Sequence, residues 1–210
     1  MHPRTIAAVW AGKAAGAGSR LLRRGGGTAI AGIAAERVDP HVVARLARQA
    51  GAGAIAITGT NGKTTTSLML NRIASEAGLR PLHNRSGSNL MRGIAAMLTE
   101  EATLSGAIPD AARRIAILEV DEATLPAITR AVGPRAIVFT NLFRDQLDRY
   151  GELAAVATKW RTALADLGPE TTVVVNADDP QLAAITEGIA ASRRCFGLDD
   201  PNPLLRLPAL

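Results

Sequence analysis

Residues 54–66 read AIAITGTNGKTTT, and the amphipathic run SLMLNRI follows at residues 67–73. An apolar β-type run, a glycine-containing loop and a helical pattern in this order predict a strand, a tight turn and the N-terminus of a helix. Gly59 and Gly62 have no Cβ, which lets successive backbone N–H groups turn toward one anion. The helix dipole adds positive potential at the same place. We interpret the loop as a phosphate cradle.

Lys63 is one of only three lysines in the chain, which has 21 arginines. Its compact ammonium suits the terminal phosphates of a nucleotide better than a planar guanidinium would. The hydroxyl of Thr64 would hold a magnesium ion that bridges those phosphates. The general P-loop pattern has a glycine five residues before Gly62, where this chain has Ile57, so the match is to a shorter variant. The alternative, a βα turn with an incidental lysine, is disfavoured by the strand and helix on either side.

The composition is that of a soluble α/β protein, with 47% apolar residues and 3% aromatic residues. A net charge of +5 raises the question of nucleic-acid binding. We expect no nucleic-acid partner, because the arginines are dispersed and are not interleaved with aromatic residues. A single cysteine, Cys195, excludes an internal disulfide and a cysteine-cluster metal site, and indicates an intracellular protein. No apolar stretch is as long as the roughly 18 residues that a bilayer crossing needs.

Apolar β-type runs and helical patterns alternate along the chain, which favours a parallel sheet with helices on both faces. The sequence therefore predicts an α/β fold with a P-loop-type sheet. The predicted strands are 54–58, 80–83, 115–120, 136–140 and 171–176. The predicted helices are 4–23, 40–49, 63–77, 89–100, 122–131, 152–166 and one near 180–190. We expect an N-terminal helical segment at 1–38, a nucleotide-binding domain at 39–198 and an irregular tail at 199–210.

Polar residues follow the predicted strands, at the edge where ligands bind in parallel sheets. Glu119 ends the apolar run 115–118, and an acid at the end of a neighbouring strand suits a second magnesium contact. Asp121 and Glu122 are better placed to cap the helix that follows. Asn141 comes directly after the next predicted strand and both donates and accepts hydrogen bonds.

Four spaced motifs together resemble the central domain of the Mur ligases. They are TGTNGKTT at 58–65 with Glu119, TN at 140–141, DQLDRY at 145–150 and NADD at 176–179. Most Mur ligases carry histidine where this chain has Gln146. With that departure, residues 84–90, 119–123 and 141–146 resemble the MurT-type subunits of lipid II isoglutaminyl synthase. The resemblance runs from about residue 20 to residue 198.

The resemblance implies an ATP-dependent carbon–nitrogen ligase of peptidoglycan and cell-wall biosynthesis. Such an enzyme activates the α-carboxyl of the D-glutamate in the lipid II stem peptide as an acyl phosphate, and ammonia then gives D-isoglutamine. A separate glutamine amidotransferase subunit, bound as a heterodimer, would supply the ammonia. The expected location is the cytoplasm, peripherally at the inner membrane face where lipid II lies.

The same resemblance assigns roles to individual residues. Catalytic roles fall to Lys63 and Glu119, and Thr64 and Glu119 would hold magnesium. The resemblance also implies a substrate channel and a carbamylated lysine; for the lysine, the alternative is a solvent-facing residue on a helix. The cofactor-binding residues would be Gly59, Thr60, Asn61, Gly62, Lys63, Thr64, Thr65 and Asn141, the substrate residues Arg85, Ser86 and Asn89, and the carbamylated residue Lys159.

MurT-type subunits continue past the region of Phe196 into a zinc ribbon and a C-terminal domain, which residues 199–210 do not resemble. We therefore expect a truncated domain that is inactive alone, with zinc only in the missing part. Alternatives are an amino-acid-adding Mur ligase or folylpolyglutamate synthase, a P-loop switch or partitioning protein, and a scaffold that docks a glutaminase.

Overall fold

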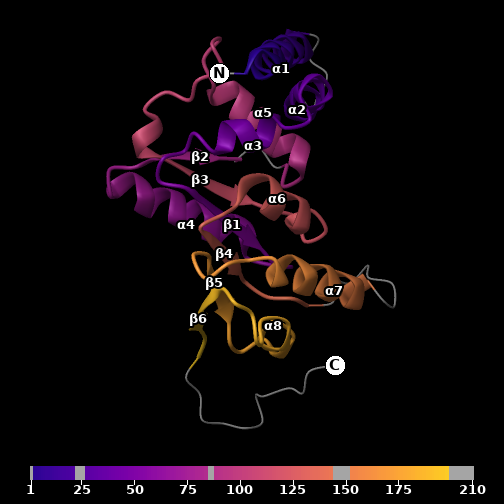
Figure 1. The fold of residues 1–210 in the computed structure, drawn as a ribbon, viewed down its shortest axis with the longest axis vertical. Helices are drawn as coiled ribbons and strands as arrows, with labels where there is room; N and C mark the ends of the chain where they lie inside the picture. The colour runs from indigo at the N-terminus through magenta and orange to yellow at the C-terminus, as the bar shows by residue number, and fades with distance from the viewer. Residues whose placement is uncertain (1, 22–26, 85–87, 144–151, 199–210) are drawn as a thin grey trace.

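The computed structural model describes residues 2–21, 27–84, 88–143 and 152–198. Its centre is a parallel sheet of six strands in the order β2-β3-β1-β4-β5-β6 (Figure 1). The strands are β1 (Ala54–Thr58), β2 (Arg80–His83), β3 (Arg114–Glu119), β4 (Ala136–Phe139), β5 (Thr172–Asn176) and β6 (Ser192–Phe196). The predicted α/β fold with a parallel sheet is confirmed.

Helices cover both faces of the sheet, as predicted (Figure 1). They are α1 (Pro3–Leu21), α2 (Gly27–Val38), α3 (Val42–Ala47), α4 (Lys63–Glu76), α5 (Met91–Glu101), α6 (Leu125–Val132), α7 (Glu152–Ala165) and α8 (Pro180–Ile185), with a 3-10 turn at Ala111–Arg113. On one face, α4 packs Leu70 and Ala74 against Ile57 and Ile117. The larger core on the other face includes side chains from α3, α5, α6, α7 and α8.

The central strands are buried on both faces because their side chains alternate between these two cores. On β1, Ala54 and Ala56 belong to the larger core and Ile57 to the smaller one. The register pairs Ile57 of β1 with Glu119 of β3, and Thr58 with Phe139 of β4. The carboxyl ends of β3, β1 and β4 therefore lie side by side at one edge, where the loop after β1 begins.

The N-terminal helices α1 and α2 pack together and against α5. A methyl group added at Gly32 would lie 1.7 Å from the backbone oxygen of Arg92, so α2 and α5 approach closely there. The carboxylate of Asp39, a fully buried residue, accepts hydrogen bonds from Thr5, at 2.8 Å, and Arg45, at 2.7 Å. Both contacts fasten α1 and α3 to the chain segment between α2 and α3.

Two elements were not predicted from the sequence, α2 and β6. Half of the residues of α2 are alanine or glycine, which leave little contrast between an apolar and a polar face. The strand β6 reads SRRCF and is exposed along its whole length, so it lacks the apolar run of a buried strand. Predicted helix bounds also differ: α5 begins at Met91, α6 at Leu125, and α8 ends at Ile185. The predicted tail at 199–210 lies outside the described residues.

Candidate nucleotide-binding site

The loop between β1 and α4 passes so close to the segment after β4 that its first residue must be glycine. Gly59 has φ +134°, and a methyl group there would lie 2.2 Å from Thr140 Oγ1 and 2.7 Å from the backbone oxygen of Asn141. Gly62 has φ +82°, with open space around it. Both glycines thus adopt backbone conformations that other residues rarely adopt, and they turn the chain from the strand into the helix.

Residues that follow β4 brace this loop. The side chain of Asn141 accepts from the backbone N–H of Asn61 at 2.8 Å and donates to the backbone oxygen of Asn61 at 3.1 Å. Thr140 Oγ1 donates to the same oxygen at 2.7 Å. The hydroxyl of Thr60 exchanges hydrogen bonds with the backbone of Phe143. Asn141, predicted as a phosphate contact, is thus bonded in the free chain to the loop itself.

The N-terminus of α4 presents backbone donors with little to neutralise them. The first N–H groups of a helix have no partner inside it. Gly62, the N-cap residue of α4, has no side chain with which to cap the helix, and the first turn of α4 contains no acidic residue. The dipole of α4 therefore favours an anion at this loop. Thr65 is exposed in the same first turn.

The ammonium of Lys63 folds back over the loop. It donates to the backbone oxygens of Gly59 and Thr60 and to Glu122 Oε1, the last at 2.8 Å. The two charged side chains are only 13% and 22% exposed. Glu122, which the sequence placed better than Glu119 for capping the next helix, does not cap α6: this helix begins at Leu125, and the carboxylate pairs with the lysine.

Glu119 lies beside the first turn of α4 and fits the predicted magnesium site. Thr64 Oγ1 donates to Glu119 Oε1 at 3.1 Å. Ligand oxygens about 2.1 Å from an octahedral Mg²⁺ lie about 3.0 Å from their neighbours, so these two oxygens are spaced for adjacent positions. The buried side chain of Asn84 accepts from the N–H of Glu119 at 2.9 Å and donates to its backbone oxygen at 2.8 Å. Asn84 therefore fixes the backbone of Glu119 at the end of β3.

Further contacts join the strand ends into one rigid edge. Asp179, which is 2% exposed, accepts from the N–H of Leu142 at 2.6 Å and caps α8. Asn176 at the end of β5 donates to the backbone oxygen of Thr140 at 3.1 Å. The segment that braces the phosphate loop is thus itself held from β5 and α8. Trp160 of α7 donates to the backbone oxygen of Glu122 at 2.8 Å.

The remaining predicted residues divide into three groups. Asn89 lies near the site, since its backbone oxygen accepts from the N–H of Asp121 at 2.9 Å. Lys159 is exposed on α7, and no hydrogen bond found among the described residues joins it to the loop. Arg85, Ser86 and Gln146 lie outside the described residues.

Sequence reasoning did not assign the roles of Asn84, Glu122 and Trp160. A signal existed for Asn84, which directly follows a predicted strand and therefore had to lie at the ligand-binding edge. Glu122 and Trp160 carried none, because their contacts join residues 59 and 38 positions apart in the sequence.

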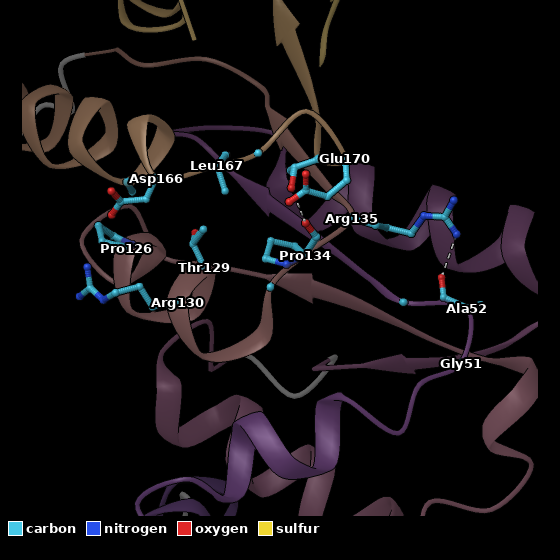
Figure 2. Close-up of a pocket in the computed structure, with 15 residues that line it drawn as sticks. Gly51, Ala52, Pro126, Thr129, Arg130, Pro134, Arg135, Asp166, Leu167 and Glu170 are labelled. Carbon is cyan, nitrogen blue, oxygen red and sulfur yellow. Dashed lines mark hydrogen bonds between the residues drawn. The ribbon is translucent and has the colours of Figure 1, made fainter. Parts of the chain in front are cut away.

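A cavity of about 550 Å³ lies at the opposite, amino-terminal edge of the sheet (Figure 2). Figure 2 shows charged side chains from separate elements around it, namely Arg130, Arg135, Asp166 and Glu170. None of the residues predicted for nucleotide or substrate binding lines this cavity. The phosphate loop and the cavity are therefore separate features of the fold.

Comparison with known proteins identifies the architecture. The Mur ligase middle domain matches residues 57–206. The chain belongs to the Mur ligase family. The chain is 34% identical over 154 residues to the lipid II isoglutaminyl synthase (glutamine-hydrolyzing) subunit MurT of Staphylococcus aureus, covering 73% of this chain and 33% of that protein. It is 36% identical over 161 residues to MurT of Streptococcus pneumoniae, covering 76% and 34%.

Solved structures agree with this fold. A crystal structure of MurF from Acinetobacter baumannii matches with a TM-score of 0.60 and 21% identity, over 82% of this chain and 35% of that one. This Mur ligase chain spans about a third of the length of the curated relatives. Within the described ranges, no helix combines the length and the hydropathy that crossing a bilayer requires.

Proposed function

We propose that this Mur ligase domain binds magnesium ATP and uses it to activate a carboxylate for attack by nitrogen. The observation that carries the proposal is the loop after β1, where Lys63, the first turn of α4 and the Thr64–Glu119 pair meet at one sheet edge. These groups match a polyphosphate with its metal ion: an ammonium, backbone N–H donors and two hard oxygen ligands.

The reaction we propose is amidation of the D-glutamate α-carboxyl of lipid II to D-isoglutamine. The two MurT relatives are named subunits of a glutamine-hydrolyzing lipid II isoglutaminyl synthase, which supports this substrate and glutamine as the source of ammonia. Because both relatives are named as subunits, we propose that this protein forms a heterodimer with a second subunit that hydrolyses glutamine. The same proposal places the protein in the cytoplasm at the inner membrane face, where lipid II is available.

Each group at the site has a task in that chemistry. A carboxylate is a poor acyl donor, and transfer of the γ-phosphoryl group makes its oxygen a leaving group. Lys63 and the amides at the start of α4 would hold the β- and γ-phosphates and stabilise the charge that develops there. Thr64 and Glu119 would hold magnesium, which supplies further charge neutralisation when bound. Asn141 keeps the loop in position through its two bonds to Asn61.

The first test is nucleotide binding by the purified chain. We expect titration with a fluorescent ATP analogue in the presence of magnesium to give saturable binding. Lys63→Ala should weaken it by about tenfold to a hundredfold, since a hydrogen bond to a charged group contributes about 1.5–3 kcal/mol. Lys13→Ala, which removes a lysine on α1 that donates to the backbone oxygen of Glu100, is the matched control. Equal ATP binding by the unchanged protein and both variants would refute the assignment of Lys63 as a phosphate ligand.

The second test is the reaction. A full-length protein that contains this domain is co-expressed with a glutamine amidotransferase and supplied with lipid II, ATP and glutamine, and the muropeptide mass is measured. Amidation replaces a hydroxyl with an amino group and should be lost in Lys63→Ala. If magnesium ATP binds but no amidated product forms with any such partner, the ligase domain stands and the substrate is wrong.

A further inference from the structure

The ammonium of Lys63 has no free N–H bond in the nucleotide-free protein. Its three partners are the backbone oxygens of Gly59 and Thr60 and the carboxylate of Glu122. An ammonium has three donors, so a phosphate oxygen can bind only if one of these partners leaves. The two backbone oxygens belong to the loop itself, whereas Glu122 comes from the segment between β3 and α6. Glu122 is therefore the partner that is replaced most easily.

The position of Glu122 is set by the core beneath it. Its backbone oxygen accepts from Trp160 Nε1 at 2.8 Å. Trp160 is fully buried and packs against Phe139, with 4.8 Å between ring centroids. Only the side chain of Glu122 is left to move, and at 22% exposure it has a route to solvent. The backbone of Glu122 is thus anchored, while its carboxylate is free to move away from Lys63.

A second carboxylate lies beside the next residue of α4. Thr64, the neighbour of Lys63, donates its hydroxyl to Glu119 at 3.1 Å. Two carboxylates, one at the end of β3 and one in the segment after it, thus lie where the nucleotide and its metal ion would bind. Glu119 is suited to stay as a metal ligand, but Glu122 bonds to the ammonium itself and would repel an incoming phosphate.

We propose that Glu122 is a positioning residue that holds Lys63 over the loop in the nucleotide-free protein and releases it to the terminal phosphates. Only the release of Lys63 to the phosphates rests on the proposed function; the ion pair in the nucleotide-free protein does not. The ion pair keeps the lysine pointing into the loop, and it makes binding depend on exchange of one anionic partner for another. Removing the carboxylate should therefore free Lys63 and tighten nucleotide binding.

The first experiment measures the ion pair without any nucleotide. Lysine acetylation by a water-soluble reagent is followed by peptide mass spectrometry, where Lys13 and Lys159 serve as internal references because the chain has only three lysines. Acetylation of Lys63 should be about fivefold faster in Glu122→Gln, the scale expected for loss of a partly exposed ion pair. Glu122→Asp, which keeps the charge but shortens the reach, should also speed it.

Asp121→Asn is the matched control, since it removes the same charge from the adjacent residue. The Asp121 carboxylate bonds to the N–H of Ala123 at 3.0 Å, which an asparagine oxygen can also do. Lys63 should then react as in the unchanged protein. Circular dichroism confirms that each variant is folded. Equal acetylation of Lys63 in all four proteins would overturn the proposal.

The second experiment titrates the same proteins with magnesium ATP. Glu122→Gln should bind about fivefold more tightly than the unchanged protein, and Asp121→Asn should not. Weaker binding by Glu122→Gln would overturn the proposal, because it would place the carboxylate on the side of the bound nucleotide or its metal. Faster acetylation without ATP binding in any variant would leave the ion pair standing and refute the proposed function.

Discussion

Replacement of Gly59 by alanine tests how closely the phosphate loop approaches the segment after β4. The new methyl group would lie 2.2 Å from Thr140 Oγ1, and 2.7 Å and 2.9 Å from the backbone oxygen and nitrogen of Asn141. Overpacking of this kind costs about 1–3 kcal/mol. The φ angle of +134° adds backbone strain of about 1–3 kcal/mol. Their midpoints sum to a destabilisation of about 4 kcal/mol.

Thermal denaturation followed by circular dichroism measures this cost. For a chain of this size each kcal/mol lowers Tm by about 2–4 °C, so Gly59→Ala should lower it by about 8–16 °C. Gly62 supplies the control within the same loop, because its φ is +82° and nothing lies within 4 Å of an added methyl group. Gly62→Ala should cost only the left-handed backbone strain of about 1–2 kcal/mol.

A glycine in the last turn of α1 is expected to have the opposite effect on stability. Gly18 has nothing within 4 Å of an added methyl group, and alanine favours a helix by about 0.8–1.0 kcal/mol over glycine. Gly18→Ala should therefore raise Tm slightly. Equal melting temperatures for Gly59→Ala and Gly62→Ala would refute the close contact between the loop and the Thr140–Asn141 segment.

Gly32→Ala should lower the free energy of unfolding by about 1–3 kcal/mol, because its methyl group would lie 1.7 Å from the backbone oxygen of Arg92; an unchanged urea midpoint would contradict the close packing of α2 on α5. Burial alone would raise the pKa of Asp39, but hydrogen bonds and the charge of Arg45 outweigh it and lower this pKa overall. The stability from this carboxylate is therefore present above its unfolded pKa and is lost as the pH falls through the folded pKa. Asp39→Asn should therefore be less stable than the unchanged protein at neutral pH, and the difference in stability should disappear in acid. Burial raises the pKa of Glu36, and Arg92 offsets only part of the shift. Here the sign reverses: Glu36→Gln should be the more stable protein at neutral pH, and its advantage in urea denaturation should shrink as the pH falls through the raised pKa.

Local sequence pattern was enough to place the sheet and the phosphate loop. The bounds of β1 and β2 are those predicted, and α4 begins at Lys63 as expected. These elements can be predicted from the sequence because apolar strand patterns, glycine turns and helical periodicity depend on residues that are close together in the chain. The order of alternating elements also indicated the parallel sheet, since parallel strands need crossover helices between them.

The partners of the site residues came only from three-dimensional packing. Lys63 meets Glu122 across 59 positions of sequence, and Asn141 meets Asn61 across 80. The strand order places β3 and β4 on either side of β1, so that their carboxyl ends flank the loop. No residue pattern near Glu122 distinguishes a helix cap from an ion pair. A cap needs free backbone N–H groups and an ion pair needs a cation, and only the tertiary fold brings Lys63 to this carboxylate.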